Sequence, residues 1–388
     1  MINIFIFLGA LFLLTFVIGK QIEKIRVPWI FASLLLGTLL AIYNPFKSIT
    51  SSETFEFMSQ LGMYFLLFII GFEINLKKLK KIGSFIFRAT FFIIFLEGVM
   101  GSLLIHFVFG YSWFIAFLVA LSFATVGEAI LIPILDEFKI INTKLGQSII
   151  GIGTLDDIIE FILLIIVIFL TGSTGNHQIN IFSITISFSF LFIIIFIIKR
   201  LKIKIQKFTH LSIENLFLLT LSIFFLFIGI GKYIQIEIIT ALLAGVILKN
   251  FLPKEKLLKI ESEIKSLCYG FFAPIFFLSV GVEMDMGYLI KYPLLILLVV
   301  SVAKTGKLLA SYLIAKNTLG TKKSILLGIG LSVRFSTSII IIKILFDNGL
   351  IKSDLFSIII ASSIVFKFLV PILFSNLLVK WKVKKNAV

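Results

Sequence analysis

Apolar runs long enough to cross a membrane follow one another along almost the whole chain, and this pattern constrains the fold more than any other feature. About 20 apolar residues span a bilayer as an α-helix. Charged residues make up only 14% of the 388 residues, too few to cover the surface of a soluble protein of this size. The Ile, Leu and Phe runs do not alternate with polar residues, which favours helices over barrel strands. The sequence therefore predicts an all-α membrane protein.

We predict thirteen transmembrane helices. The first run is taken as a retained span, because it lacks the basic segment and the small-residue cleavage site of a signal peptide. The expected ranges are 2–19, 27–43, 57–74, 83–109, 112–135, 145–171, 180–198, 212–231, 234–248, 266–283, 292–315, 324–346 and 355–378.

Lys and Arg residues are concentrated in alternate loops between these spans. Of the 36 such residues, 26 lie in loops after odd-numbered spans, and only Lys47, Lys232, Lys291 and Lys352 lie in loops after even-numbered ones. Cytoplasmic loops carry an excess of Lys and Arg. We therefore expect the amino terminus outside and the carboxyl terminus in the cytoplasm. The net charge of +16 then reflects topology and contact with anionic lipid, not nucleic-acid binding.

Residues that usually hold structural metals or disulfides are scarce. The lone Cys268 excludes an intrachain disulfide and a cysteine-based metal site. His106, His177 and His210 are scattered along the chain, which argues against a histidine metal site. We expect no cofactor.

Three segments recur in the same order about 210 residues later. "ASLLLGTLL" around Gly37 matches "TALLAGVIL" around Gly245, and "GFEINL" at Gly71 matches "GVEMDM" at Gly281. "LSFATVGEAILIPILDEFKII", which starts at Leu121, matches "LSVRFSTSIIIIKILFDNGLI" 210 residues further on. A shift of seven spans is odd, so the second copy crosses the membrane in the opposite sense. Such inverted repeats are typical of secondary transporters, with the ion site near the midplane.

The predicted organisation is one transmembrane domain over residues 1–388. It comprises repeat one at about 1–171, a linking helix at about 180–198 and repeat two at about 212–378. We expect no soluble regulatory domain, because the chain stops about ten residues after its last span.

The two copies of the "LS" segment are poor apolar helix. "SFATVGEA" is small and polar, and "SVRFSTS" carries an arginine and three hydroxyl residues. Interrupted helices at membrane depth are tolerated only beside protein or a water-filled cavity. We expect two broken helices whose ends point into the centre of the protein.

Ten of the charged residues within the predicted spans are candidates for a functional role, five acids and five bases. They are Glu97, Glu128, Asp156, Asp157, Glu160, Lys304, Lys307, Arg334, Lys343 and Lys367. The numerical balance suggests that most of them are paired. At the repeat offset of 210, Glu97 corresponds to Lys307 and Asp157 to Lys367, which suggests electrostatic compensation between the repeats.

Asp156 and Asp157 stand side by side in "GIGTLDDIIEFILLIIVIFL", one of the most apolar parts of the chain. Adjacent residues of a helix point about 100° apart, so one carboxylate can face a partner while the other faces a cavity. An unpaired carboxylate in such a setting can take up and release a proton near neutral pH, and its oxygens can instead hold a desolvated Na⁺ or Li⁺. A group that binds a proton or a cation, but never both, is sufficient for exchange.

The chain resembles the transmembrane domain of the bacterial monovalent cation:proton antiporters, the branch with NapA-type sodium/proton and Kef-type potassium exchangers. The resemblance covers nearly all residues. It is carried by "RVPWIFASLLLGTLLA", "LGMYFLLFIIGFEINLKKLKK", "GIGTLDDII", "VAKTGK" and the two broken-helix segments. It implies an NhaA/NapA-like fold with crossed broken helices, a homodimer, and a location in the bacterial inner membrane. It also implies a transporter, not an enzyme, with monovalent cations, protons and lipid as partners.

In that family the second acid of the pair carries the ion, which makes Asp157 the expected Na⁺ ligand. Asp156 is expected to pair with the lysine that matches Lys304. A core bundle of spans 4–6 and 11–13 is expected to move as an elevator against a dimerisation bundle of spans 1–3 and 8–10. Further residues with expected supporting roles are Thr125, Glu128, Thr154, Glu160, Arg334 and Ser336.

One motif departs from the family pattern. The last broken helix of the family often reads Pro-Arg-Gly-Glu, whereas this chain has "VRFS" at 333–336, with Arg334 kept and the glutamate missing. This departure bears on cation selectivity more than on the exchange chemistry.

The leading hypothesis is therefore electrogenic exchange of cytoplasmic Na⁺ or Li⁺ for external H⁺. Potassium/proton exchange on the same scaffold is the alternative. A sodium-coupled organic-solute symporter with a related fold is less favoured, because it does not require a lysine opposite the aspartate pair. An intramembrane aspartyl protease is disfavoured, because its two acids come from different helices and adjacent residues cannot converge on one water.

Overall fold

A computed structural model describes residues 3–25, 27–73, 83–124, 128–171, 211–233, 236–333 and 336–381. The linking helix expected at about 180–198 lies outside these residues. Within them the chain is helical and contains no strand. The helices are α1 (Ile4–Glu23), α2 (Phe31–Ile42), α3 (Lys47–Thr50), α4 (Glu53–Glu73), α6 (Ser84–Phe109), α7 (Trp113–Ala124), α8 (Glu128–Glu137), α9 (Lys144–Thr171), α11 (Ile213–Tyr233), α12 (Glu237–Phe251), α13 (Lys254–Leu267), the π-helical turn η2 (Cys268–Phe272), α14 (Ala273–Val282), α15 (Met286–Lys291), α16 (Pro293–Leu319), α17 (Thr321–Gly330), α18 (Ser336–Asp347) and α19 (Ser353–Lys380).

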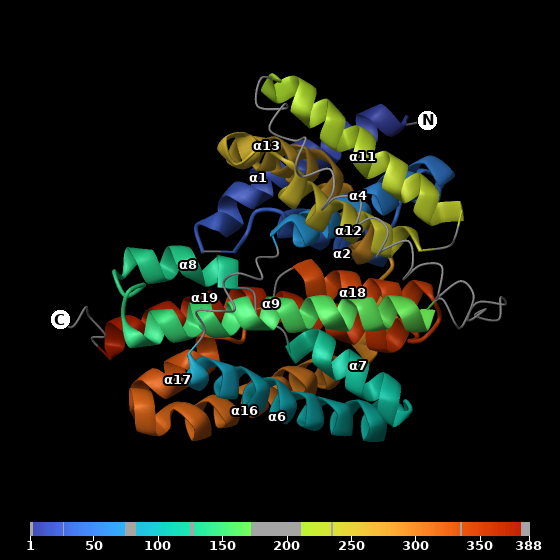
Figure 1. The fold of residues 1–388 in the computed structure, drawn as a ribbon. Coiled ribbons are helices and arrows are strands. Elements are labelled where there is room, and N and C mark those ends of the chain that lie inside the picture. The colour runs from blue at the N-terminus through green and yellow to red at the C-terminus, as the bar shows by residue number, and fades with distance from the viewer. Residues whose placement is uncertain are drawn as a thin grey trace.

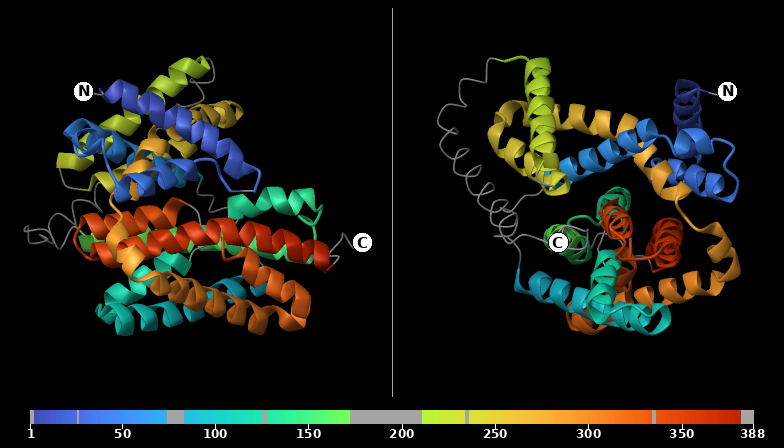
Figure 2. Two further views of the ribbon diagram at one scale, coloured as in Figure 1. Left: turned by 180° about the vertical axis from the view of Figure 1, so that it is seen from behind. Right: turned by 90° about the vertical axis from the view of Figure 1, so that its right-hand side faces the viewer.

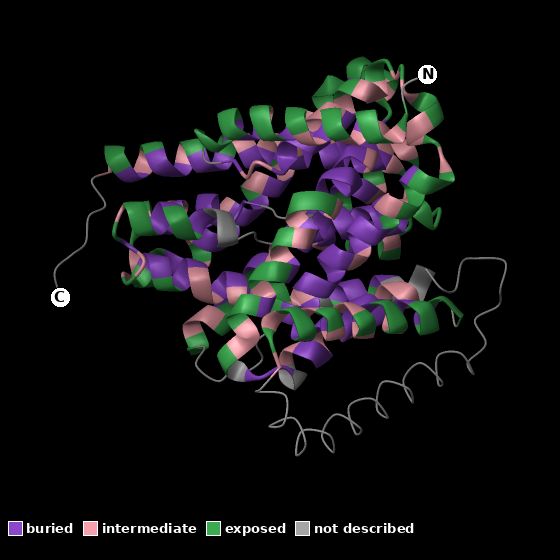
Figure 3. Ribbon diagram, turned by 90° about the horizontal axis from the view of Figure 1, so that it is seen from above, coloured by how far each residue is buried: buried purple, intermediate pink, exposed green. Residues whose placement is uncertain are grey.

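Seven of the described helical segments are long and apolar enough to cross a membrane. The outer faces of these helices carry large exposed apolar side chains, such as Phe5 at 80% and Phe107 at 72% exposure, while buried residues gather between the helices (Figure 3). An outward-facing apolar surface of this extent is what a bilayer requires. The prediction of a multi-spanning helical membrane protein is confirmed.

The helices form two groups, separated in Figure 1 into an upper and a lower part (Figures 1 and 2). The upper bundle contains α1, α2, α4 and α11–α14. The lower bundle contains α6–α9 and α16–α19. These groups match the spans expected for the dimerisation and core bundles, respectively.

Two helices of the lower bundle are interrupted where the sequence predicts breaks. One ends as α7 at Ala124 and resumes as α8 at Glu128; the other ends as α17 at Gly330 and resumes as α18 at Ser336. All four half-helices pack against α9. The polar "LS" segments therefore interrupt helices beside other protein, as the cost of unsatisfied backbone groups requires.

Glycines hold the upper bundle together at two equivalent crossings. A side chain at Gly37 of α2 would meet the backbone of Leu278 and Gly281 in α14, and one at Gly245 of α12 would meet the backbone of Phe68 in α4. Close backbone approach through small residues is a common mode of helix packing in membranes. In the proposed repeat, Gly37 corresponds to Gly245, and Gly71 of α4 corresponds to Gly281 of α14. Each crossing therefore joins one helix of repeat one to one helix of repeat two.

The tenth predicted span, 266–283, forms the last part of a longer helical segment. The helical segment begins at Lys254 and continues through α13 and η2 into α14. The sequence of α13, "KEKLLKIESEIKSL", alternates charged and apolar residues with helical spacing, so a search for purely apolar runs misses it. The short helices α3 and α15 were also not expected, because each covers less than two turns.

Candidate ion site

The aspartate pair lies in the middle of α9, the helix that touches all four half-helices. Asp156 is buried, with 1% of its surface exposed, whereas its neighbour Asp157 is exposed. Glu160, one turn further along, is buried at 6% exposure, and Thr154 is half-buried. The prediction that the adjacent carboxylates occupy different environments is confirmed.

A buried lysine joins the two interrupted helices. Lys307 of α16 lies 3.0 Å through its Nζ from Glu97 Oε2 of α6, and the side chains are only 1% and 2% exposed. The same Nζ donates hydrogen bonds to the carbonyl oxygens of Ala124, at 2.5 Å, and Leu331, at 3.0 Å. The Lys307 ammonium therefore makes two hydrogen bonds to backbone carbonyls and one ion pair.

The position of these acceptors explains why a cation is stable there. Ala124 ends α7, and Leu331 caps the C-terminal end of α17. The last carbonyls of a helix have no partner within the helix, and this end carries the negative pole of the helix dipole. The Lys307 ammonium neutralises two such ends, and Glu97 balances its remaining charge. The suggested compensation between Glu97 and Lys307 is thus realised as a direct ion pair.

Lys304, the lysine expected to pair with Asp156, lies one turn before Lys307 and is half-buried. Among the described residues, no ion pair within 4.0 Å joins Lys304 to Asp156. The sequence contained a signal that separates the two lysines. The buried face of α16 includes Ala303, Gly306 and Ala310 at helical spacing, and Lys307 falls on this stripe of small residues whereas Lys304 does not.

The side chains of four expected supporting residues are not described. Thr125 and Arg334 lie outside the described residues. Glu128 and Ser336 are the first residues of α8 and α18, and their side chains are not described. Their backbones stand at the N-terminal, positive ends of two half-helices, opposite in polarity to the ends that Lys307 contacts.

A second buried lysine connects the two bundles. Lys367 of α19, 1% exposed, places its Nζ 3.2 Å from the ring centroid of Phe31 at the start of α2. A cation over an aromatic face is stabilised by the ring quadrupole, and more strongly where water is excluded.

Interrupted helices that meet beside paired buried charges define a membrane protein of the secondary-transporter class. The family described as "Sodium/hydrogen exchanger, transmembrane" matches residues 9–380. The chain belongs to this family.

Full-length relatives and solved structures agree with this assignment. The chain is 26% identical to "Probable Na(+)/H(+) antiporter 3" of Methanocaldococcus jannaschii, over 94% of each chain. It is 28% identical to the "Na(+)/H(+) antiporter" of Enterococcus hirae, over 98% of each. A Kef-type relative, the "Glutathione-regulated potassium-efflux system protein KefC" of Shigella flexneri, is 23% identical over 73% of this chain and 46% of its own. The fold is similar to that of the sodium proton antiporter MjNhaP1 from Methanocaldococcus jannaschii at pH 8, with a TM-score of 0.62 and 19% identity over 97% of this chain and 96% of that one.

Proposed function

We propose that this protein exchanges Na⁺ or Li⁺ for H⁺, with Asp157 as the group that binds either the cation or the proton. The observation that carries this proposal is the exposed Asp157 beside the buried Asp156, on α9, which touches all four half-helices. An exposed oxygen ligand at this place is accessible to a cation, while the surrounding half-helices supply backbone groups that can complete its coordination. Membership of the exchanger family supports the same chemistry.

We also propose that Asp156 and Lys304 pair in one state of the cycle and separate in the other. Among the described residues no ion pair within 4.0 Å joins the two, as the proposal expects for the separated state. Lys304 would then release its proton when Asp157 takes up a cation. Two protons would move per cation, and the exchange would be electrogenic.

The elevator movement is supported by the division of the molecule into two bundles. Asp157, Lys304 and Lys307 all belong to the lower bundle, so the whole ion site would move with it against the upper bundle. The homodimer is part of this proposal, because a static partner is needed for such a movement.

The sides of the membrane assigned to the segments between spans are supported by two contacts that each join residues expected on the same side. Lys352 N donates to Tyr111 Oη, and both residues are expected outside; Lys249 Nζ donates to the Glu73 carbonyl, and both are expected inside. In addition, α1 begins at one end of the helical stack and α19 ends at the other (Figure 1).

Potassium/proton exchange is the second candidate, because KefC relatives match most of this chain. The direct test uses purified protein in liposomes with an imposed pH gradient and a fluorescent pH probe. Dissipation of the gradient by Na⁺ and Li⁺, but not by K⁺, is the expected result. A response to K⁺ alone would favour the second candidate, and a response to no cation would contradict both. Uptake of an organic solute driven by Na⁺ would favour the symporter.

A further inference from the structure

A polar cavity of about 570 Å³ opens between the two bundles, away from the ion site. Its walls come from α4 and α14 of the upper bundle and from the last turn of α18 in the lower bundle. In the proposed topology, the first residues of α4 and the last residues of α14 and α18 lie on the outer side of the membrane. The cavity therefore faces outside. It carries three carboxylates, Glu56, Glu283 and Asp347, against a single cation, Lys343.

Lys343 of α18 is held by two carboxylates of different origin. Its Nζ lies 2.9 Å from Glu283 Oε2 at the end of α14, so this ion pair connects the two bundles. It also pairs with Asp347, one turn away on its own helix. Ser279 of α14 donates a hydrogen bond of 3.1 Å to the other oxygen of Glu283. The side chain of Lys343 is only 11% exposed, whereas those of Glu283 and Asp347 are 31% and 42% exposed, so the lysine is buried and its two partners face the cavity.

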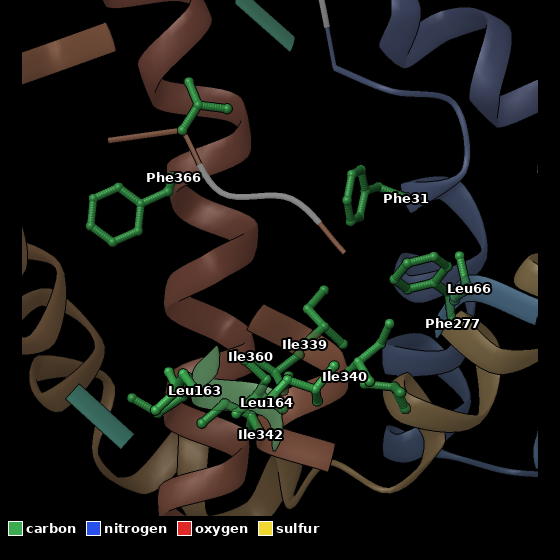
Figure 4. Packing of buried hydrophobic residues seen from close by; sticks show 14 of the residues in the cluster. Phe31, Leu66, Leu163, Leu164, Phe277, Ile339, Ile340, Ile342, Ile360 and Phe366 are labelled. Atoms are coloured by element: carbon green, nitrogen blue, oxygen red, sulfur yellow. The ribbon is translucent and has the colours of Figure 1, made fainter. Parts of the chain in front are cut away.

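From Lys343 toward the start of α18, the helix enters dry apolar packing, called the seal below. Ile340 and Ile339 lie three and four residues before Lys343, on the face of α18 that carries it. Ile340, Leu66 of α4 and Phe277 of α14 are at most 1% exposed and belong to one packed cluster (Figure 4). A hydrated ion in the cavity cannot pass this seal. A path from outside to the ion site requires α18 to move away from α4 and α14.

We infer that this cavity is the outer mouth of the pathway for hydrated monovalent cations and protons, and that the Glu283–Lys343 ion pair holds it shut. The inference rests on the proposed exchange function and its topology. Movement of α18 away from α14 separates Glu283 from Lys343 but leaves Asp347 with the lysine. The lysine is therefore never left as an uncompensated buried charge, which would be strongly destabilising. Glu283 keeps its hydrogen bond from Ser279. A lock of this kind can open and close repeatedly.

The test measures how easily a reagent from outside reaches the seal. Cys268 is the only cysteine, so Cys268→Ala gives a background without thiols. In it, Ile340→Cys reports the seal, and Ser51→Cys, an exposed position on the rim of the cavity, reports the outer side. A membrane-impermeant thiol reagent is added to intact cells. Adding Glu283→Gln should accelerate labelling of the Ile340→Cys reporter about fivefold, the population change that about 1 kcal/mol produces.

Asp347→Asn is the matched control. It removes the same charge from the same lysine but leaves the contact between the bundles, and it should not accelerate labelling. Equal acceleration by both variants, or none by Glu283→Gln, would overturn the inference. So would failure of the Ser51→Cys reporter to react from outside.

If Glu283→Gln does not fold, Lys343→Gln serves in its place and should accelerate labelling likewise. Labelling does not depend on transport, so loss of the labelling effect in a protein that exchanges Na⁺ for H⁺ would refute only the lock. A protein that labels as expected but exchanges no cation would refute the function instead.

Discussion

Lys307→Met is expected to lower the free energy of unfolding by about 3–5 kcal/mol, the usual cost of removing one partner from a buried ion pair. The structure gives the reason for expecting the full effect. The substitution removes the Lys307 ammonium from beside the Glu97 carboxylate, which is 2% exposed, and from the carbonyls of Ala124 and Leu331. Methionine retains a similar volume, so the loss is electrostatic and not a cavity.

The partner substitution and the double variant separate the ion pair from the helix ends. Glu97→Leu should also cost about 3–5 kcal/mol, because the Lys307 ammonium is then uncompensated. In the double variant no charge is stranded, but two carbonyls still lack a donor, at about 1–3 kcal/mol each. The double variant should therefore be less destabilised than the sum of the single variants by several kcal/mol.

Equilibrium unfolding in mixed micelles with increasing SDS content, followed by tryptophan fluorescence, measures these values. Lys265→Met is the matched control. Lys265 pairs with Glu73 at 2.6 Å, but the two side chains are 35% and 50% exposed, and such pairs are worth at most about 1 kcal/mol. Two results would contradict the role given to Lys307 at the helix ends. One is that Lys307→Met costs no more than Lys265→Met, and the other is that the effects of Lys307→Met and Glu97→Leu simply add.

Three further outcomes test the proposed mechanism. Asp157→Asn should abolish exchange in liposomes while leaving the unfolding midpoint nearly unchanged, because the amide keeps the shape but cannot cycle a proton; substantial remaining exchange would remove Asp157 from the mechanism. Wild-type exchange should produce a current on a solid-supported membrane, and Lys304→Gln should make any surviving exchange electroneutral; a wild type without current would contradict the two-proton scheme. In the thiol-free background, Ser112→Cys should react with an impermeant reagent from outside and Thr143→Cys should not; the reverse pattern would invert the topology.

The sequence predicted the coarse fold well because membrane insertion depends on local composition. Long apolar runs mark spans, and small polar residues mark the breaks after Ala124 and before Ser336. The different environments of Asp156 and Asp157 followed from helix geometry alone. The amphipathic α13 was missed, since its charged residues hide its helical periodicity from a search for apolar runs.

The partners of the buried charges were harder to predict. The choice between Lys304 and Lys307 depends on which face of α16 meets α6 and the half-helices, and this is set by tertiary packing. The repeat offset pointed from Glu97 to Lys307, but it carried no information about the two carbonyl acceptors. The roles of Glu283 and Asp347 were invisible in the sequence, because each residue stands at the end of a helix and looks like an ordinary loop charge until α14 and α18 are brought together.

Three lysines of the lower bundle, Lys304, Lys307 and Lys343, differ in the number of oxygen atoms that surround the ammonium group. This difference suggests a different role for each. Lys307 donates to two carbonyls and pairs with one carboxylate, so loss of its proton would disturb three buried contacts at once. Lys343 pairs with two carboxylates on different elements, so it can lose the contact with Glu283 and still be compensated by Asp347. Lys304 is half-buried and makes no ion pair within the described part of the chain. Among the described residues, release of a proton from Lys304 breaks no ion pair. A proton-coupled lysine must be able to lose its charge once in every cycle, and of these three Lys304 meets that requirement with the least disruption.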